Sequence, residues 1–291
     1  MAGEDKSWRS IGFAIPLLAF IILFVLIPVL GTLWDSFFLD VPYRKLRFIG
    51  FSNYTWLFQD PAFHKAAAFT FLFVIASVPL QVFVGLAVAL VLNERIPFRG
   101  VVRATVLIPW AIPAAVSARI FELIYNYSFG AANSLLKFFH LHREPVNWLG
   151  SETGAFIALV VADSWKTAPF AAIILLAGLS AVSDDLYSQA MVDRASMVQR
   201  FFRITVPLLK PVLIVTVLFR TVDSLRIFDV IYVLTGGGPG GATTSLSLFS
   251  FQYFSSADFG YGSASSVILF LSALILSMIL VRAGNFEREV L

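Results

Sequence analysis

The fold is decided by the stretch "AAAFTFLFVIASVPLQVFVGLAVALVL", residues 66–92, which contains no charged side chain. A helix needs about 20 mostly apolar residues to cross the hydrocarbon core of a bilayer. The rest of the chain is similarly apolar, with 58% hydrophobic and 13% charged residues, whereas soluble domains have about 25% charged residues. So few charges cannot cover a surface in contact with water, and the composition therefore predicts an integral membrane protein.

Six apolar runs of this kind are expected to form membrane-spanning helices within a single domain that covers residues 1–291. The alternation with period two that is typical of a membrane β-barrel is absent from them. The predicted fold class is therefore an all-α polytopic membrane protein. The first run is longer than the apolar core of a signal peptide, so we expect it to be retained. The spans are placed at residues 11–33, 66–92, 104–125, 154–179, 211–234 and 261–282.

The distribution of Lys and Arg between the loops predicts the orientation of the chain. Basic residues are more numerous in the segments that share a side with the N-terminus, which predicts that the N- and C-termini are both cytoplasmic. Residues 183–211 then face the cytoplasm. The glycine-rich "TGGGPGGATT", residues 235–244, faces outside, where we expect a flexible loop.

Several ionisable residues fall within the predicted spans, although each costs about 2.5–3.5 kcal/mol at the centre of a bilayer. Residues three apart are neighbours on a helix, and this spacing recurs in three sets: Arg119 with Glu122, Asp163 with Lys166, and the alternating series Arg220, Asp223, Arg226 and Asp229. The first two sets favour structural ion pairs. For the series of the fifth span, structural pairing and a polar translocation path both remain open.

The stretch "QAMVDRASMVQRFFRITVPLLKP", residues 189–211, interrupts the apolar runs with a basic, amphipathic segment. Its apolar residues follow helical spacing, and the preceding Ser183, Asp184 and Asp185 are typical of a helix start. "PLLKP", residues 207–211, is expected to break this helix before the next span. Composition alone leaves two interpretations open: a helix that docks on another protein, or a helix that lies on anionic lipid.

Nothing in the sequence predicts a catalytic, nucleotide or metal site. The phosphate-binding pattern G-x-x-x-x-G-K-[ST] is absent, so ATP-driven transport would need an ATPase on another chain. There is no cysteine, and two of the three histidines stand in "HLH", residues 140–142, where a loop is favoured over a metal site. No basic run suggests a nucleic-acid partner.

The segment "YSQAMVDRASMVQRFFRITVPLLKP", residues 187–211, resembles the EAA loop of permease subunits in ATP-binding-cassette (ABC) importers. Residues at the positions of that motif are Ala190, Asp193, Ala195, Phe201, Ile204, Pro207 and Pro211. Three positions depart from it: Ser188 replaces an acid, Gln189 an alanine and Arg194 a glycine.

Other segments are similar to the carbohydrate-importer branch of that family. These are "FIGFSNYTWLFQDP" (48–61), "RGVVRATVLIPWAIP" (99–113), "DSWKTAPFAAIILLAGLSAV" (163–182) and "LFRTVDSLRIFDVIYVLTGGGPGGATTSL" (218–246). The last two look especially like trehalose/maltose-type permeases. Together the matching segments cover most of the chain.

The resemblance implies a permease of the type I ABC importer architecture in the cytoplasmic (inner) membrane of a bacterium or archaeon. It implies a sugar importer with a second, usually different, permease subunit, two ATP-binding subunits and an external sugar-binding protein. This chain would then be a non-catalytic pore subunit that binds no cofactor, with ATP and Mg on the partner ATPase. The resemblance assigns coupling to that ATPase to Ala190, Asp193, Arg194, Ala195, Met197, Phe201 and Pro207.

A sugar site needs aromatic surfaces for the ring face and a few oriented polar groups for the hydroxyls. Candidates for the substrate path near the third and fifth spans are Asp223, Arg226, Asp229, Tyr232, Glu122, Tyr125, Asn126 and Trp110. Two other classes of function remain open. One is an ion-coupled secondary transporter that uses the Asp/Arg series of the fifth span, and the other is an uncoupled channel or scaffold.

Overall fold

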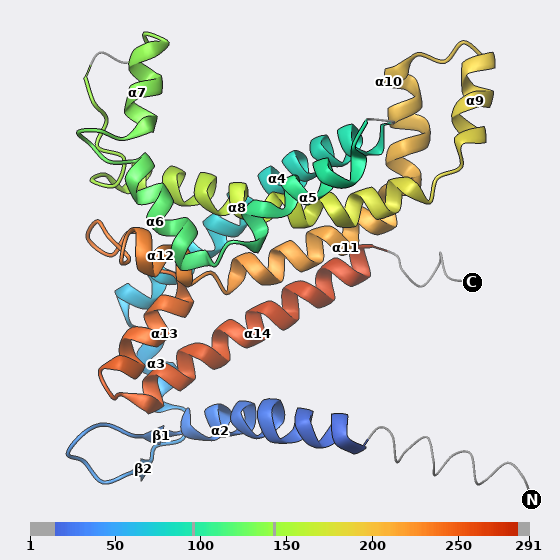
Figure 1. Cartoon of the computed structure of the whole chain (residues 1–291). Coiled ribbons are helices and arrows are strands. Elements are labelled where there is room, and N and C mark those ends of the chain that lie inside the picture. Colours follow the sequence, from blue (N-terminus) through green and yellow to red (C-terminus); the bar gives the residue numbers. More distant parts are fainter. Residues whose placement is uncertain (1–14, 95–96, 142–143, 285–291) are drawn as a thin grey trace, which may run out of the picture. The chain divides into compact units, whose positions relative to one another are not determined.

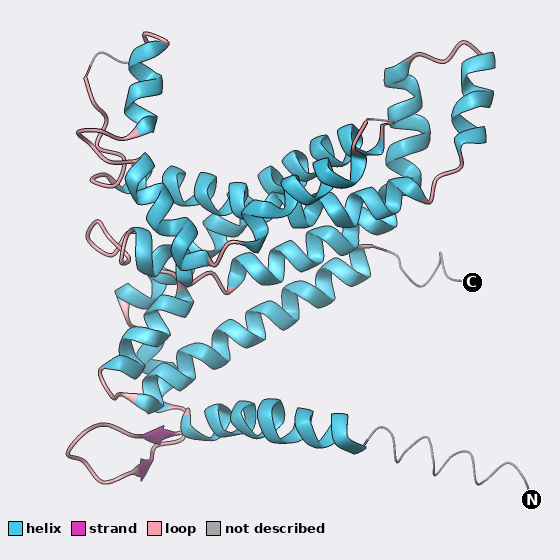
Figure 2. Cartoon of the chain, viewed as in Figure 1, coloured by secondary structure: helices cyan, strands magenta, loops and turns pink. Residues whose placement is uncertain are grey.

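The computed structural model describes residues 15–94, 97–141 and 144–284. Helices dominate this part of the chain, with a single two-stranded hairpin (Figure 2), so the predicted helical class is confirmed. The chain divides into two compact units, residues 1–61 with 249–270 and residues 62–248 with 271–291. Each unit is described by itself. The termini, whose cytoplasmic location was predicted, lie outside the described residues.

Five described helices are long and apolar enough to cross a membrane, and a bent pair of helices could form a sixth span. The five are Ile15–Asp35, α4 (Pro61–Asn93), α8 (Glu152–Ser180), the helical stretch Met197–Leu225 and α14 (Phe259–Ala283). The bent pair consists of α5 (Arg99–Ala111) and α6 (Ala114–Ile124), which meet at an angle of 88°.

This bend divides the span predicted at residues 104–125 into two helices. Ile112 is extended, with ψ of 133°, because the ring of Pro113 disfavours a helical conformation in the residue before it. Pro113 also lacks the N–H that would continue the helix. The chain therefore leaves α5 at Ile112 and starts α6 in a new direction.

The first unit is held together by hydrogen bonds from a buried asparagine. Its elements are η1 (Ile22–Leu26) and α2 (Ile27–Asp35), the antiparallel strands β1 (Phe38–Leu39) and β2 (Arg47–Phe48), α3 (Ser52–Leu57), most of α13 (Leu246–Ser255) and the first half of α14. Asn53 of α3 donates to the carbonyl oxygens of Ser36 and Phe38, each at 2.9 Å. These bonds satisfy backbone carbonyls where the chain leaves α2 and enters β1.

The second unit is a bundle in which α4, α5, α8 and α11 (Val206–Leu225) lie side by side (Figure 1). α4 approaches α8 at Gly85, where an added β-carbon would lie 2.8 Å from the Cβ of Ala171. Only glycine allows this close approach. α7 (Ala131–Phe138) and the pair α9 (Asp184–Val192) and α10 (Met197–Arg200) lie at opposite ends of the bundle (Figure 1).

The helix from α10 into α11 passes through two prolines that were expected to break it. The π-helical turn η2 (Phe201–Thr205) immediately precedes α11, and Pro207 stands in the first turn of α11. Pro211 is accommodated inside α11. The predicted break at residues 207–211 is therefore wrong, and Met197–Leu225 forms one candidate span.

The glycine-rich loop at residues 235–244, for which flexibility was predicted, contains internal hydrogen bonds. The hydroxyls of Thr235 and Thr243 are 2.8 Å apart, and Thr243 Oγ1 donates to the carbonyl oxygen of Gly238 at 2.6 Å. Gly236, Gly237, Gly240 and Gly241 all have positive φ, a conformation that glycine adopts without steric cost.

Candidate functional site

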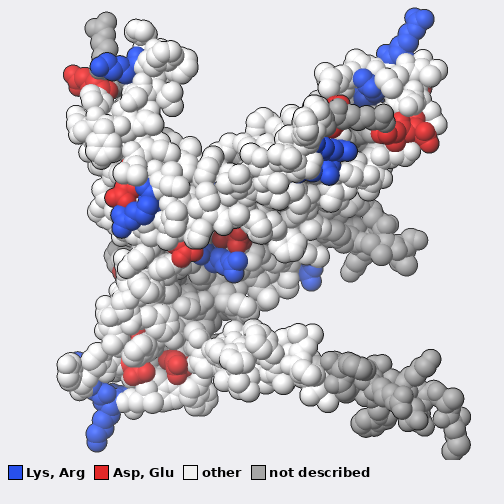
Figure 3. Space-filling view, viewed as in Figure 1, with Lys and Arg blue, Asp and Glu red and all other residues white. Residues whose placement is uncertain are grey.

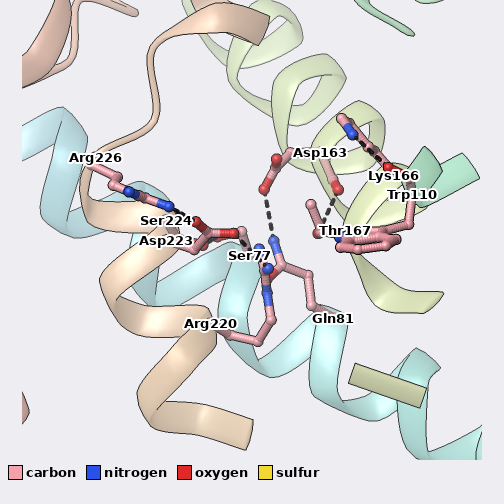
Figure 4. A network of polar contacts seen from close by, with 10 residues as sticks. All are labelled: Ser77, Gln81, Trp110, Asp163, Lys166, Thr167, Arg220, Asp223, Ser224 and Arg226. Carbon is pink, nitrogen blue, oxygen red and sulfur yellow. Dashed lines mark hydrogen bonds and ion pairs between the residues drawn. The ribbon is translucent and has the colours of Figure 1, made fainter. Parts of the chain in front are cut away.

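A chain of polar side chains joins α4, α8 and α11 inside the second unit (Figure 4). Gln81 of α4 donates from Nε2 to Asp163 Oδ2 of α8 at 2.7 Å. Its Oε1 accepts from Arg220 Nε of α11 at 2.8 Å. The side-chain amide of Gln81 therefore donates a hydrogen bond to an acid, Asp163, and accepts one from a cation, Arg220. Gln81 thus bridges opposite charges that come from two different helices.

The chain of contacts continues along α11 and ends at an exposed cation. Asp223 accepts from Arg220 and from Arg226, with oxygen–nitrogen distances of 2.8 Å in each ion pair. The exposed fraction of the side chain rises from 2% for Arg220 to 42% for Asp223 and 71% for Arg226. One guanidinium is therefore fully enclosed by its partners, while the other lies at the outer end of the same contacts.

Lys166 of α8 does not pair with Asp163, which corrects the predicted ion pair between residues three apart. Its Nζ donates to the carbonyl oxygen of Trp110 at 3.2 Å (Figure 4). Trp110 lies in the last turn of α5, where carbonyls lose their helical partners. A cation at this position also interacts favourably with the helix dipole. Lys166 therefore caps α5 at its bend, while Asp163 bonds Gln81 instead.

Trp110 and Glu122, two of the predicted path residues, have partly exposed side chains. The carbonyl of Trp110 is held by Lys166, and its indole stacks on Phe170 with ring centroids 5.5 Å apart. The predicted pair Arg119–Glu122 is confirmed as an ion pair on α6.

Tyr125 and Asn126 follow α6 and support the local fold. The buried Tyr125 hydroxyl donates to the carbonyl oxygen of Ala158 at 3.4 Å. The side-chain oxygen of Asn126 accepts the N–H groups of Ser128 and Phe129, an arrangement that shapes a turn.

The predicted stripe of alternating charge stops at Arg226. α11 ends at Leu225, and Asp229 begins the separate helix α12 (Asp229–Leu234). The step of three residues therefore does not continue on one helix from Arg226 to Asp229. Tyr232 of α12 is exposed and stacks on Phe228, with ring centroids 5.3 Å apart and planes at 15°.

The predicted coupling segment consists of two helices and not one. Ser183 caps α9 by accepting the N–H of Asp185 at 3.2 Å, which confirms the predicted helix start. Ser196 and Gln199 form a reciprocal capping box at the start of α10. The prediction that the apolar residues of this segment follow one helical spacing is therefore wrong, because a turn separates Ala190 from Met197.

That turn has a well-defined backbone geometry. Arg194 has a φ of 57°, in the left-handed region. The N–H of Arg194 donates to the carbonyl oxygen of Met191 at 3.0 Å, and the N–H of Ala195 to that of Ala190 at 2.9 Å. These two bonds form a Schellman motif, which ends a helix with one residue in the left-handed conformation.

The coupling candidates differ in exposure. Asp193, Arg194, Met197 and Pro207 are exposed, whereas Ala190, Ala195 and Phe201 are half-buried. On the face shown in Figure 3, charged side chains form separate groups on a largely uncharged surface. Residues 15–94, 97–141 and 144–284 contain no group of three or more His, Cys, Asp or Glu that could hold a metal ion.

Comparison with known proteins gives a family match over most of the chain. Residues 81–285 match the model of the family described as "Binding-protein-dependent transport system inner membrane component". The chain is 49% identical over 276 residues to the trehalose/maltose transport system permease protein MalF of Thermococcus litoralis, covering 94% of this chain and 93% of that protein.

Other relatives carry different substrates in their names. The chain is 38% identical to the sulfoquinovosyl glycerol transport system permease protein SmoG of Agrobacterium fabrum, covering 89% of this chain and 85% of that protein. It is 36% identical to the trehalose transport system permease protein SugA of Mycobacterium tuberculosis strain H37Rv, covering 81% and 74% of the two chains.

The fold matches a solved transporter. A bacterial alginate ABC transporter in complex with its alginate pentasaccharide-bound periplasmic protein contains a chain that superimposes with a TM-score of 0.84 at 22% identity. The match covers 98% of this chain and 96% of that chain. At this level of identity the likeness concerns the fold.

Proposed function

This chain belongs to the binding-protein-dependent transport system inner membrane components, and we propose that it forms part of the pore of an ATP-driven importer for a disaccharide of the trehalose/maltose type. The family match over residues 81–285 carries this proposal. The identity of 49% to a trehalose/maltose permease, over nearly the full length of both chains, supports the sugar class.

The proposed complex contains a second permease subunit, two ATP-binding subunits and an external sugar-binding protein, in the cytoplasmic membrane of a bacterium or archaeon. The related alginate transporter is in complex with a sugar-bound periplasmic protein, which supports the external partner. Hydrolysis of ATP and binding of Mg occur on the ATP-binding subunits. This chain contributes the conformational change and part of the path that the sugar takes across the membrane.

Coupling in this proposal runs from α9 and α10 along a single helical body. Met197–Leu225 has 29 residues, which corresponds to about 43 Å at 1.5 Å per residue. One end of this helix is the exposed α10, and the other carries Arg220 and Asp223 of the polar chain. A displacement imposed on α10 is therefore transmitted as a rigid-body movement to the middle of the bundle.

The substrate path in this proposal passes the exposed end of the polar chain. Asp223 and Arg226 offer charged hydrogen-bonding groups, and Asp229 lies in the first turn of the neighbouring α12. The exposed Tyr232 offers an aromatic face to a sugar ring. Trp110 and Glu122 lie on α5 and α6 and complete the candidate set.

We expect Tyr232→Ala to lower the uptake of trehalose or maltose at subsaturating concentration by about fivefold, because an aromatic face contributes about 1 kcal/mol to such a contact. Tyr232→Phe is the matched control, since it keeps the ring and should retain most of the uptake. Initial rates are measured with labelled sugar and normalised to the amount of assembled complex. Equal uptake rates for the wild type, Tyr232→Ala and Tyr232→Phe would show that Tyr232 does not contact the sugar.

Co-purification tests the proposed assembly. This chain is co-expressed with the ATP-binding subunits and the second permease encoded in the same genome, extracted in mild detergent and isolated through a tag on this chain alone. The proposal predicts that both ATP-binding subunits follow the chain in a fixed ratio. A folded chain that leaves them behind would contradict the proposal.

A further inference from the structure

Arg194 stands at a position where its backbone conformation disfavours every residue that has a side chain. Its φ of 57° lies in the left-handed region, where a β-carbon comes too close to the following carbonyl oxygen. Glycine adopts this conformation freely and is the usual residue at the end of a Schellman motif. An arginine here therefore weakens the turn that it forms part of.

The surrounding structure keeps this turn in place in spite of that strain. The two N–H bonds to Ala190 and Met191 end α9, and the capping box of Ser196 and Gln199 starts α10 two residues later. The backbone on both sides of Arg194 is therefore fixed by its own hydrogen bonds. The direction in which the arginine leaves the turn is fixed with it.

Nothing inside the described chain accounts for the guanidinium. Arg194 is exposed, and its side chain takes part in no hydrogen bond or ion pair with the described residues. Other arginines of the second unit, such as Arg119, Arg220 and Arg226, are held in ion pairs. The Arg194 side chain therefore makes no stabilising contact within the described chain, although its backbone is strained.

Exposed apolar side chains flank this cation on both helices. Val192, at the end of α9, is 83% exposed, and Met197, at the start of α10, is 76% exposed. Val198 is exposed as well. In a protein contact, apolar side chains beside an arginine exclude water from it and strengthen an ion pair that it makes.

The charge around Arg194 favours a protein partner over a lipid surface. Asp184, Asp185 and Asp193 accompany Arg194, Arg200, Arg203 and Lys210 in residues 183–211, so acids offset all but one of the positive charges. Recognition of anionic lipid typically uses clusters of four to eight Lys and Arg residues without intervening acids. A single presented cation beside acids instead fits a single carboxylate.

We propose that Arg194 forms an ion pair with an Asp or Glu side chain on the ATP-binding subunit, and that this pair determines which ATP-binding subunit the chain accepts. This inference rests on the proposed function and names the chemistry by which the α9–α10 turn recognises its partner. Arginine suits this role because its planar guanidinium can hold a carboxylate with two parallel hydrogen bonds.

The test compares substitutions that separate charge from backbone strain. Arg194→Gly removes the charge and relieves the strain, so the turn itself keeps its geometry. Arg194→Lys keeps both the charge and the strain, and Arg203→Ala removes an exposed cation from the same segment without a change at the turn. The affinity of the purified ATP-binding subunit for detergent-solubilised permease is measured at several salt concentrations.

We expect Arg194→Gly to weaken binding about tenfold at low salt and to reduce the salt dependence of the affinity. Arg194→Lys should lose about threefold or less, and Arg203→Ala less than twofold. Equal or tighter binding by Arg194→Gly would overturn the inference. The same holds if Arg194→Gly changes only the binding of the permease to vesicles that contain phosphatidylglycerol, because the partner of the arginine would then be lipid.

A charge exchange identifies the partner residue. Arg194→Glu keeps the backbone strain and should abolish binding, and one Asp→Arg or Glu→Arg substitution on the ATP-binding subunit should restore it. If no acidic position on that subunit restores binding, the proposed ion pair does not exist. A wild-type permease that binds no ATP-binding subunit in this assay contradicts the proposed function instead, so the two failures are distinguishable.

Discussion

Replacing Arg220 by alanine is expected to destabilise the second unit by about 3–5 kcal/mol, because it leaves a buried polar network without one of its partners. The guanidinium is 2% exposed and bonds both Gln81 and Asp223. Its loss leaves the amide oxygen of Gln81 without a donor inside a membrane-spanning bundle, where no water compensates. The measurement is the free energy of unfolding in detergent, followed by intrinsic fluorescence.

The neighbouring Arg226 gives a matched control for this experiment. It pairs with the same carboxylate of Asp223 at the same distance of 2.8 Å, but its side chain is 71% exposed. An exposed ion pair contributes about 1 kcal/mol or less, so Arg226→Ala should leave the stability nearly unchanged. Arg220→Lys should fall between the two, since an ammonium keeps the charge but not the fork of donors. Similar costs for Arg220→Ala and Arg226→Ala would contradict the role assigned to the buried network.

The second large effect is expected at the exposed face of α10 and η2. Val198→Glu combined with Phe202→Glu should lower ATP-driven sugar uptake at least about 100-fold, because the centre of a protein contact contributes several kcal/mol and does not tolerate buried carboxylates. Both side chains are 64% exposed, so the fold should remain intact. Uptake, ATPase capture and thermal stability are measured on the same preparation.

A matched double variant at α7 and its C-cap residue Phe139 separates coupling from a general effect of added charge. Leu135→Glu with Phe139→Glu introduces the same two carboxylates at the same spacing, on side chains that are 58% and 62% exposed. α7 lies at the opposite end of the bundle from α10 (Figure 1). ATPase capture should therefore survive in this control. A loss of capture in both double variants, or in neither, would contradict coupling through α10.

The long helices were predictable from the sequence because their signal is local. α4, α8 and α14 correspond to apolar runs at residues 66–92, 154–179 and 261–282. The bend between α5 and α6 falls at Pro113, but its angle of 88° could not be predicted, because a proline alone does not distinguish a kink from a new direction. The sequence predicted a break at Pro207 and Pro211, but the helix continues through both. The π-helical turn η2 that precedes Pro207 has no sequence signature, so this continuity could not be predicted.

The polar site was predictable only as pairs within one helix. The spacing of three identified Arg119 with Glu122, and Asp223 with its two arginines, because such neighbours are set by helix geometry. Gln81 was missed because its partners come from α8 and α11, and contacts between helices leave no mark on spacing. Its position as a lone long polar side chain in the apolar run of residues 66–92 was the available signal.

The bond from Lys166 to Trp110 could not be predicted from side-chain types. Its acceptor is a backbone carbonyl that loses its helical partner only because α5 ends at Ala111. The strain at Arg194 was partly visible, since arginine stands where the resembling motif has glycine. Its interpretation required the φ of Arg194 and the two N–H bonds that end α9.

The central claim, that this chain is the pore subunit of an ATP-driven sugar importer, is tested most directly by uptake into proteoliposomes. The permease pair and the ATP-binding subunits are reconstituted with ATP and Mg inside, and the sugar-binding protein with labelled trehalose or maltose outside. The account predicts accumulation above the external concentration that requires internal ATP and persists with ionophores present. Accumulation driven by a proton or sodium gradient without ATP, or uptake that never exceeds equilibrium, would contradict it.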